Sequence, residues 1–213
     1  LVTVQILVPS WEDFEVLTKP PPKTSIASPA IGSLMQYSSA ESANERIQIS
    51  GTVTATTAGA VYVQDATGGV VVEPDEAVGV QPGDRVLVVG FLAPRKFHAV
   101  IQDGDVHVIG RGLVEPVEIT TTEANRGRFS NLLVRTEAYL VDSSEYGGTH
   151  RLILQAGKTL FTARLPQSNQ QDRLILPRKG DLLELTGVCV ADFTIARADA
   201  STTVQGSGFE LLL

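Results

Sequence analysis

The sequence holds few of the groups that carry out chemistry. Its 213 residues include one cysteine, three histidines and only 6% aromatic residues. The single cysteine, Cys189, excludes an internal disulfide framework, and its place in the apolar run TGVCVADF indicates a small buried side chain. His98, His107 and His150 are scattered along the chain, so no catalytic triad or metal cluster is visible. We therefore predict that this segment is not an enzyme, whatever domains its parent chain carries, and that it has no catalytic, cofactor-binding or metal-binding residues and no cofactor.

Long hydrophobic runs are also missing. No run approaches the ~18 apolar residues of a membrane-spanning helix, and no signal peptide is visible. The chain starts at Leu1, without an initiator Met, and opens inside a strand pattern, LVTVQILV. We expect a segment of a longer protein, for which missing targeting signals carry no weight.

An excess of positive charge is absent as well. The formal net charge is −7, which argues against a protein whose task is to neutralise phosphates, because nonspecific nucleic-acid affinity comes mainly from Lys and Arg. The acidic stretches EPDEA and QDGDVH lack the ligand spacing of a calcium loop. We interpret both stretches as polar turns.

What the sequence does contain is short strands and explicit turns. Nineteen glycines and eleven prolines separate runs rich in Val and Thr, such as RIQISGTVTAT, AVYVQDA, GVVVEP and DRVLVVGFL. In VYVQDATGGVVVEP, Asp65 is expected to bond back to the backbone while Gly68 and Gly69 accept positive φ, which predicts a hairpin. The tetrad QPGD places Pro82 and Gly83 where a type II turn requires them.

The same pattern of strands and turns occurs twice along the chain. VQPGDRVLVVGFL and LPRKGDLLELTGVCV match turn for turn, and a short helix is predicted before each block of strands, in PAIGSLMQY and in the threonine-rich VEITTTEANRGRFS. The repeat is a helix plus five strands of roughly ninety residues. Five short strands with a Gly-bent first strand predict an all-β fold of tandem five-stranded OB-fold-like barrels, each preceded by a short helix. A β-sandwich is the alternative.

These units divide the chain into three parts. Residues 23–112 are predicted to form barrel 1 and residues 113–213 barrel 2, while residues 1–22 hold the terminal strand of a preceding unit and a Pro-rich linker. The opening VQILV resembles the closing FELLL, so the parent protein is expected to hold several units in series. Strand 1–8 would then pair with barrel 2 of its own chain or with another copy, since an unpaired apolar edge promotes aggregation.

Several of these stretches resemble a known family. RIQISGTVTA, VYVQDATGGVVVE, VQPGDRVLVVGFLAP, DVHVIGRG and GDLLELTGVCV are similar to OB-fold modules in the extracytoplasmic sensor regions of bacterial signalling proteins, of the histidine kinase or diguanylate-cyclase type. The resemblance implies a non-enzymatic sensory or ligand-binding module in the periplasmic or extracytoplasmic part of an inner-membrane protein. Its partner would be an unidentified small molecule or a neighbouring protein module, and contact with the membrane would come only through the parent chain.

Few residues remain available to contact a ligand. Turn chemistry accounts for most of VYVQDATGGVVVE, leaving Tyr62 and Gln64, while Val61 and Val63 are expected to point into the core. The loop PRKFHAV is the most concentrated basic and aromatic cluster. The candidate ligand contacts are Tyr62, Gln64, Arg95, Lys96, Phe97 and His98.

Two other functions stay open. The first is a passive structural spacer, which would have no concave binding site. Single-stranded nucleic-acid binding would use strands two and three of a barrel, where the second unit offers Arg151, Phe161 and Arg164. The acidic balance and the scarcity of aromatics weigh against nucleic acid as a partner.

Overall fold

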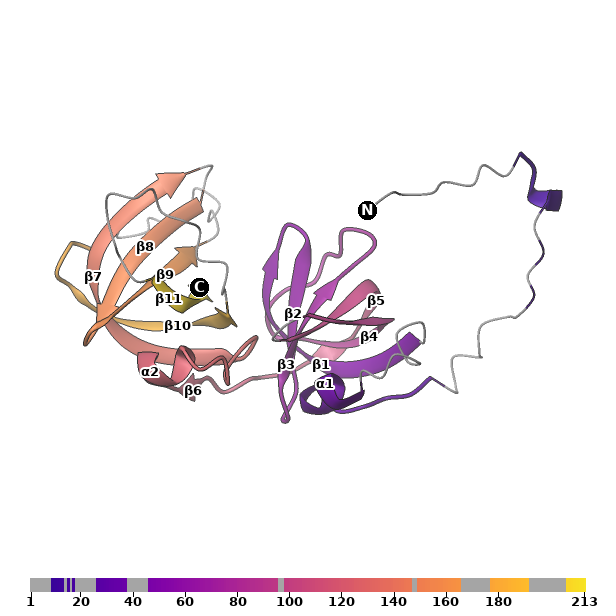
Figure 1. The fold of residues 1–213 in the computed structure, drawn as a ribbon, viewed down its shortest axis with the longest axis horizontal. Coiled ribbons are helices and arrows are strands. Elements are labelled where there is room, and N and C mark those ends of the chain that lie inside the picture. The colour runs from indigo at the N-terminus through magenta and orange to yellow at the C-terminus, as the bar shows by residue number, and fades with distance from the viewer. Residues whose placement is uncertain are drawn as a thin grey trace.

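The chain forms two β-barrels in the computed structural model, which describes residues 9–13, 15, 17, 26–37, 46–95, 98–146, 149–165, 177–191 and 206–213. Figure 1 shows the barrels side by side, with β2 and β3 of the first unit facing the second. The predicted strand at 1–8 lies outside the described residues, and the predicted boundaries at residues 22 and 112 stay predictions.

The elements of the first unit are η1 (Trp11–Asp13), η3 (Ile31–Ser33), α1 (Leu34–Tyr37), β1 (Arg46–Thr57), β2 (Ala60–Gln64), β3 (Gly69–Glu73), β4 (Asp84–Pro94) and β5 (Ala99–Arg111). Those of the second are β6 (Val117–Glu118), α2 (Thr121–Ala124), β7 (Leu133–Tyr146), β8 (Thr149–Ala156), β9 (Thr159–Leu165), β10 (Leu182–Ala191) and β11 (Gly206–Leu212).

Both units share one strand order. Barrel 1 closes as β1-β2-β3-β5-β4, and barrel 2 runs β10-β11-β9-β8-β7-β6 with an additional β10–β7 pairing that completes the same circuit. In each unit the third and fifth strands are parallel and the other pairings of the circuit antiparallel. The predicted all-β tandem of OB-fold-like barrels is therefore confirmed.

The first strand of barrel 1 is bent so that it can pair on both sides. Its first half pairs with β4 and its second half with β2, and the change occurs near Gly51. A Cβ at Gly51 would lie 2.7 Å from a methyl group of Val63, so the inward bend requires glycine.

The matched turns also take the same form. Gly83 has φ +90° and Gly180 has φ +93°, and each turn closes with a 3.0 Å backbone hydrogen bond, Asp84 N–H to Gln81 O and Asp181 N–H to Arg178 O. The type II turn predicted at Pro82–Gly83 is consistent with this geometry.

The hairpin glycines have a different role from the one predicted. Neither Gly68 nor Gly69 has a positive φ. A Cβ at Gly68 would lie 3.0 Å from the backbone of Gly32, and one at Gly69 would overlap the backbone oxygen of Asn131. Close approach of other chain segments, rather than turn geometry, requires glycine at both positions.

The two short helices begin in different ways. In the second unit Thr120 caps α2, accepting from the N–H of Glu123 while the Glu123 carboxylate accepts from Thr120, as the threonine-rich stretch predicts. In the first unit the helical turn begins at Ile31 rather than at Pro29, and no side chain of the flanking Ala30 caps it. The capping oxygen comes instead from the hairpin, since Asp65 Oδ2 accepts from Ile31 N–H at 3.0 Å.

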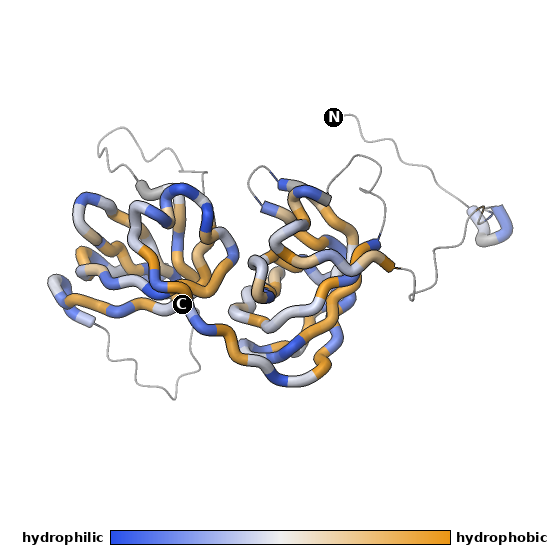
Figure 2. The backbone as a smooth tube through the Cα atoms, turned by 90° about the horizontal axis from the view of Figure 1, so that it is seen from below, coloured by the Kyte–Doolittle hydropathy of each residue, from blue (hydrophilic) through white to orange (hydrophobic). Residues whose placement is uncertain are grey.

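Each barrel encloses its own apolar core. Ile49, Val63 and Ile101 lie at the centre of the first core, and in the second the rings of Phe161 and Phe209 stack with centroids 5.0 Å apart. Cys189 is 1% exposed in the second core, which confirms it as a buried side chain. In Figure 2 the apolar stretches follow the strands of both barrels.

Candidate functional site

Tyr62 and Gln64 lie on the outer face of β2. Val61 and Val63 point into the core of barrel 1, as the alternation of the strand predicts. Tyr62 is nevertheless only 7% exposed and Gln64 8%, because barrel 2 covers this face. The role of either residue as a ligand contact stays a prediction, since both contact barrel 2 in this arrangement.

In the described part of the chain, the contact between the barrels is apolar and includes a specific hydrogen bond. Tyr62 packs in a cluster with Val188 and Leu212, against which Val71 and Leu133 also pack. The side-chain oxygen of Gln64 accepts from the backbone N–H of Leu133 at 2.8 Å. Burial raises the pKa of the Tyr62 phenol; the Arg164 guanidinium partly opposes this effect and the Glu210 carboxylate adds to it. We call the cluster of Tyr62, Val71, Leu133, Val188 and Leu212 the barrel interface.

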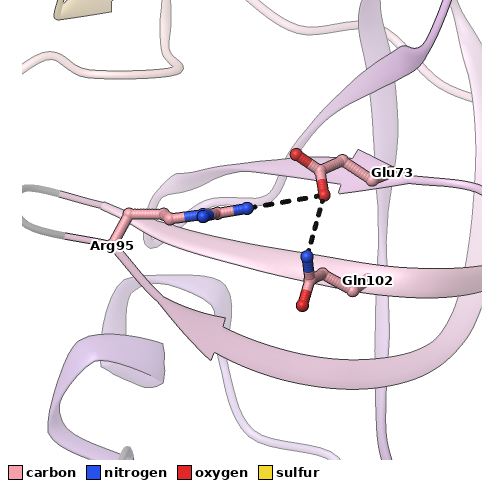
Figure 3. A network of polar contacts seen from close by, with 3 residues as sticks. All are labelled: Glu73, Arg95 and Gln102. Atoms are coloured by element: carbon pink, nitrogen blue, oxygen red, sulfur yellow. Dashed lines mark hydrogen bonds and ion pairs between the residues drawn. The ribbon is translucent and has the colours of Figure 1, made fainter. Parts of the chain in front are cut away.

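The loop after β4 holds two of the other candidates, Arg95 and His98. The Arg95 guanidinium lies 3.8 Å from Glu73 Oε2, and the same oxygen accepts from Gln102 Nε2 at 3.2 Å (Figure 3). The backbone N–H of Arg95 donates to the carbonyl of His98 at 2.9 Å. Lys96 and Phe97 lie outside the described residues. The one described cation of the predicted basic cluster is thus already paired with a carboxylate.

The surroundings of His98 favour the neutral form of its imidazole. Burial lowers the pKa of its imidazole, the charge of Arg95 lowers it further, and Glu73 opposes the shift. Its Nδ1 is buried and has no hydrogen-bond partner among the residues that the structure describes. These effects work against a positive charge on His98 in this loop.

Barrel 2 presents its corresponding face to solvent. Side chains alternate along β8 and β9, so that Leu152, Leu154, Phe161 and Ala163 are buried in the core. The outward residues face each other across the two strands in three pairs, Arg151 with Arg164, Ile153 with Thr162, and Gln155 with Leu160. Of the residues that the sequence offered here, the two arginines point outward and Phe161 points inward. We call these six residues the β8–β9 face.

The two arginines of this face differ in their surroundings. Arg164 Nε lies 2.7 Å from Glu210 Oε2, and Thr162 donates to the other Glu210 oxygen at 3.2 Å. The Glu210 side chain is 12% exposed and that of Arg164 46%. Arg151 is exposed and forms no ion pair with any residue that the structure describes. The face therefore holds one compensated cation beside one free cation.

An exposed aromatic side chain adjoins this face. Tyr139 on β7 is 55% exposed and pairs with Gln155 on one side and with Leu182 on the other. Sequence reasoning missed Tyr139, although the alternation in TEAYLV places it opposite the buried Ala138 and Leu140. The tyrosine ring offers a stacking surface beside Gln155, at the end of the β8–β9 face away from the two arginines.

The acidity of the chain is not spread evenly. Residues 113–213, the predicted range of barrel 2, hold ten Lys and Arg against twelve Asp and Glu, so this part contributes −2 of the total of −7. The net charge therefore does not oppose an anionic ligand at barrel 2 as the whole-chain figure suggests.

Metal-ligand clusters and membrane-spanning helices are both absent from the described residues. No group of three or more His, Cys, Asp or Glu side chains is placed to hold a metal ion in the described ranges. Within the same residues, no helix is both long and apolar enough to cross a membrane.

Comparisons with known proteins give low similarity throughout. No family model matches the chain, and no curated protein matches it. A structure of the S. pombe Stn1–Ten1 complex is 15% identical, covering 42% of this chain and 82% of the other, with a TM-score of 0.32. Fission yeast Pot1 with ssDNA is 11% identical over 86% and 82% of the two chains, with a TM-score of 0.32. A murine DNA-binding protein bound to dsDNA is 9% identical over 78% and 92%, with a TM-score of 0.35.

These comparisons overturn the predicted sensor module. Of the three similar structures named above, two are proteins bound to single-stranded or double-stranded DNA, and none is a bacterial sensor region. The stretches on which the resemblance depended, such as VQPGDRV and VYVQDATGG, form turns and a hairpin that the barrel itself requires, so they do not distinguish one function from another. The sensory function is therefore wrong.

Two dependent predictions are wrong with it. The extracytoplasmic location in an inner-membrane protein rested wholly on the sensor resemblance. The prediction that nucleic acid is an unlikely partner rested on the whole-chain charge and the scarcity of aromatics; the whole-chain charge does not describe barrel 2, and the similar structures include DNA complexes.

Proposed function

We propose that this chain binds single-stranded nucleic acid on the β8–β9 face of barrel 2. The observation that carries the proposal is the position of Arg151 directly opposite Arg164 on an exposed outer face. Arg151 forms no ion pair among the described residues, and Arg164 keeps N–H donors beyond its ion pair with Glu210, so both guanidinium groups are available to a bound anion. Phosphate is an anion for which the planar guanidinium is well suited.

The rest of the face suits unpaired bases. Strands two and three of an OB barrel commonly provide the ligand surface, and in barrel 2 these strands are β8 and β9. Tyr139 offers a ring for stacking, and Gln155 beside it offers an amide that can both donate and accept hydrogen bonds. Ile153 and Leu160 add apolar area to the same β8–β9 face. Stacking on such a surface needs a base whose face is free, which favours single strands over duplexes.

Barrel 1 has a supporting role in this proposal. Its own strand two and strand three face is covered by barrel 2 through the barrel interface, and Arg95 is paired with Glu73. The covered face also favours a second candidate function, a structural spacer in which the docked barrels bind nothing.

The experiment is a pair of charge reversals. Fluorescence anisotropy would measure binding of a labelled dT12 oligonucleotide to the wild type, to Arg151→Glu and to Arg128→Glu. Arg128 is exposed in the segment between α2 and β7, so its reversal changes the net charge equally without touching the face. We expect Arg151→Glu to weaken binding about tenfold or more, the loss of one charge-assisted contact, and Arg128→Glu to bind like the wild type. Equal effects of both reversals would contradict the proposed face, and no binding by the wild type would favour the spacer.

A further inference from the structure

A cleft of about 550 Å³ opens where the two barrels meet. Barrel 1 contributes the end of β1 and the following turn, residues 54–58, together with Pro82. Barrel 2 contributes residues from β8, β9, β10 and β11, among them Thr149, Arg164 and Leu212. The volume falls in the range of about 300–1,000 Å³ that is usual for small-molecule sites.

The lining of the cleft is apolar with hydroxyl groups and a single charge. Leu133 and Leu212 belong to the barrel interface, and Ala55 packs against the same cluster, so they form an apolar floor. Threonine hydroxyls from both barrels line the same cleft. Among its described lining residues, Arg164 alone is charged. A flat group with hydrogen-bonding edges and an anion at one end fits this lining.

The cleft is continuous with the β8–β9 face. Arg164 belongs to both, and Thr149 lies two residues before Arg151 on β8. A strand that contacts Arg151 and Arg164 with successive phosphates therefore reaches the mouth of the cleft.

The ion pair with Glu210 orients the Arg164 guanidinium but does not occupy all of its N–H donors. Glu210 contacts Arg164 at Nε, and Thr162 holds the other oxygen of that carboxylate. A guanidinium has five N–H donors, so one carboxylate leaves donors on a side chain that is 46% exposed. Glu210 is thus a positioning residue for a second anion.

We propose that the cleft holds one nucleotide of the bound strand, with its base between the barrels and its phosphate on Arg164. This inference rests on the proposed function and extends it to barrel 1, which then forms one wall of the site. Binding of the base would depend on both barrels and on their docking through Tyr62 and Gln64.

The test is a substitution that places an aromatic ring in the cleft. Ala58 is exposed at its rim, and Ala58→Phe places a phenyl group where the base is proposed to lie. Ala77→Phe, at an exposed position of the β3–β4 connection outside the cleft, is the matched control. We expect Ala58→Phe to weaken dT12 binding about tenfold and Ala77→Phe to leave it unchanged. Wild-type affinity in Ala58→Phe would overturn the inference while leaving the β8–β9 face in place, whereas no binding by the wild-type protein would overturn the proposed function itself.

A second measurement needs no variant. In ¹⁵N-resolved NMR spectra of the wild type titrated with dTMP, we expect the amide signals of Thr56, Ala58 and Thr186 to shift, and inorganic phosphate to shift only those near Arg164. Shifts confined to β8 and β9 with dTMP would overturn the placement of the base in the cleft.

Discussion

Asp65 connects two elements that are far apart in sequence. One oxygen accepts from Thr67 N–H, Thr67 Oγ1 and Gly68 N–H, at 2.6 to 2.9 Å, and the other accepts from Ile31 N–H. Burial of the Asp65 carboxyl raises its pKa, but the hydrogen bonds from Thr67, Ile31 and Gly68 outweigh burial, so that the net pKa is lowered. The ionised carboxylate therefore stabilises both the hairpin and the first helical turn.

We predict that Asp65→Ala lowers the free energy of unfolding of barrel 1 by about 1–3 kcal/mol near neutral pH, the cost of losing charge-assisted hydrogen bonds. Because the folded pKa of Asp65 lies below the unfolded value, its contribution is present above the unfolded pKa and is lost as the pH falls through the folded pKa. Urea unfolding at pH 7 and at pH 3 should show a difference between variant and wild type that shrinks at the lower pH. A difference of the same size at both pH values would contradict this role for the ionised carboxylate.

Cys189 gives a second prediction at this scale. Burial raises the pKa of its thiol to about 12, and the side chain is 1% exposed. Since only the thiolate reacts, folded protein at pH 8 should resist a disulfide-exchange reagent and react as barrel 2 unfolds in urea. Rapid reaction of the folded protein would mean that barrel 2 opens readily around β10.

The glycines show how far single residues could be predicted. The positive φ of Gly83 follows from the local sequence QPGD, because a type II turn needs it there. The role of Gly69 could not be predicted locally, because the atom that excludes a side chain belongs to Asn131 in the other unit. Contacts made over such separations leave no trace in a short window of sequence.

At the scale of elements, the docking of β2 and β3 against barrel 2 determines which faces are open. The alternation of β2 predicts that Tyr62 and Gln64 point outward, and they do. What covers them could not be predicted, because Val188 and Leu212 lie in strands more than a hundred residues further along the chain. Tyr139 became a candidate only when strand pairing placed it beside Gln155.

We predict that Val71→Glu separates the barrels. Val71 packs against the barrel interface, where an unpaired carboxylate would be buried in apolar surroundings. Small-angle scattering should give a larger radius of gyration for the variant than for the wild type. Val108→Glu, at a valine that is 54% exposed on β5, is the control and should leave the radius unchanged. An unchanged radius in Val71→Glu would contradict the interface.

At the scale of the whole molecule, the two barrels have unequal roles. The repeat predicted from VQPGDRVLVVGFL and LPRKGDLLELTGVCV is present as two copies of one strand order. Equivalent copies suggest equivalent binding faces. The face formed by the second and third strands is nevertheless covered in barrel 1 and open in barrel 2. The asymmetry arises from the docking of the two units, and it is the reason that we propose barrel 2, with the cleft beside it, as the binding half of the molecule.

The account depends most directly on whether the intact protein binds a single strand through phosphate contacts. A titration of labelled dT12 at a series of salt concentrations from about 50 mM upward measures this. With contacts to two phosphates, at Arg151 and Arg164, log K should fall with log salt with a slope of about −1.4. Binding that is absent at about 50 mM salt, or that does not change with salt, would contradict the account.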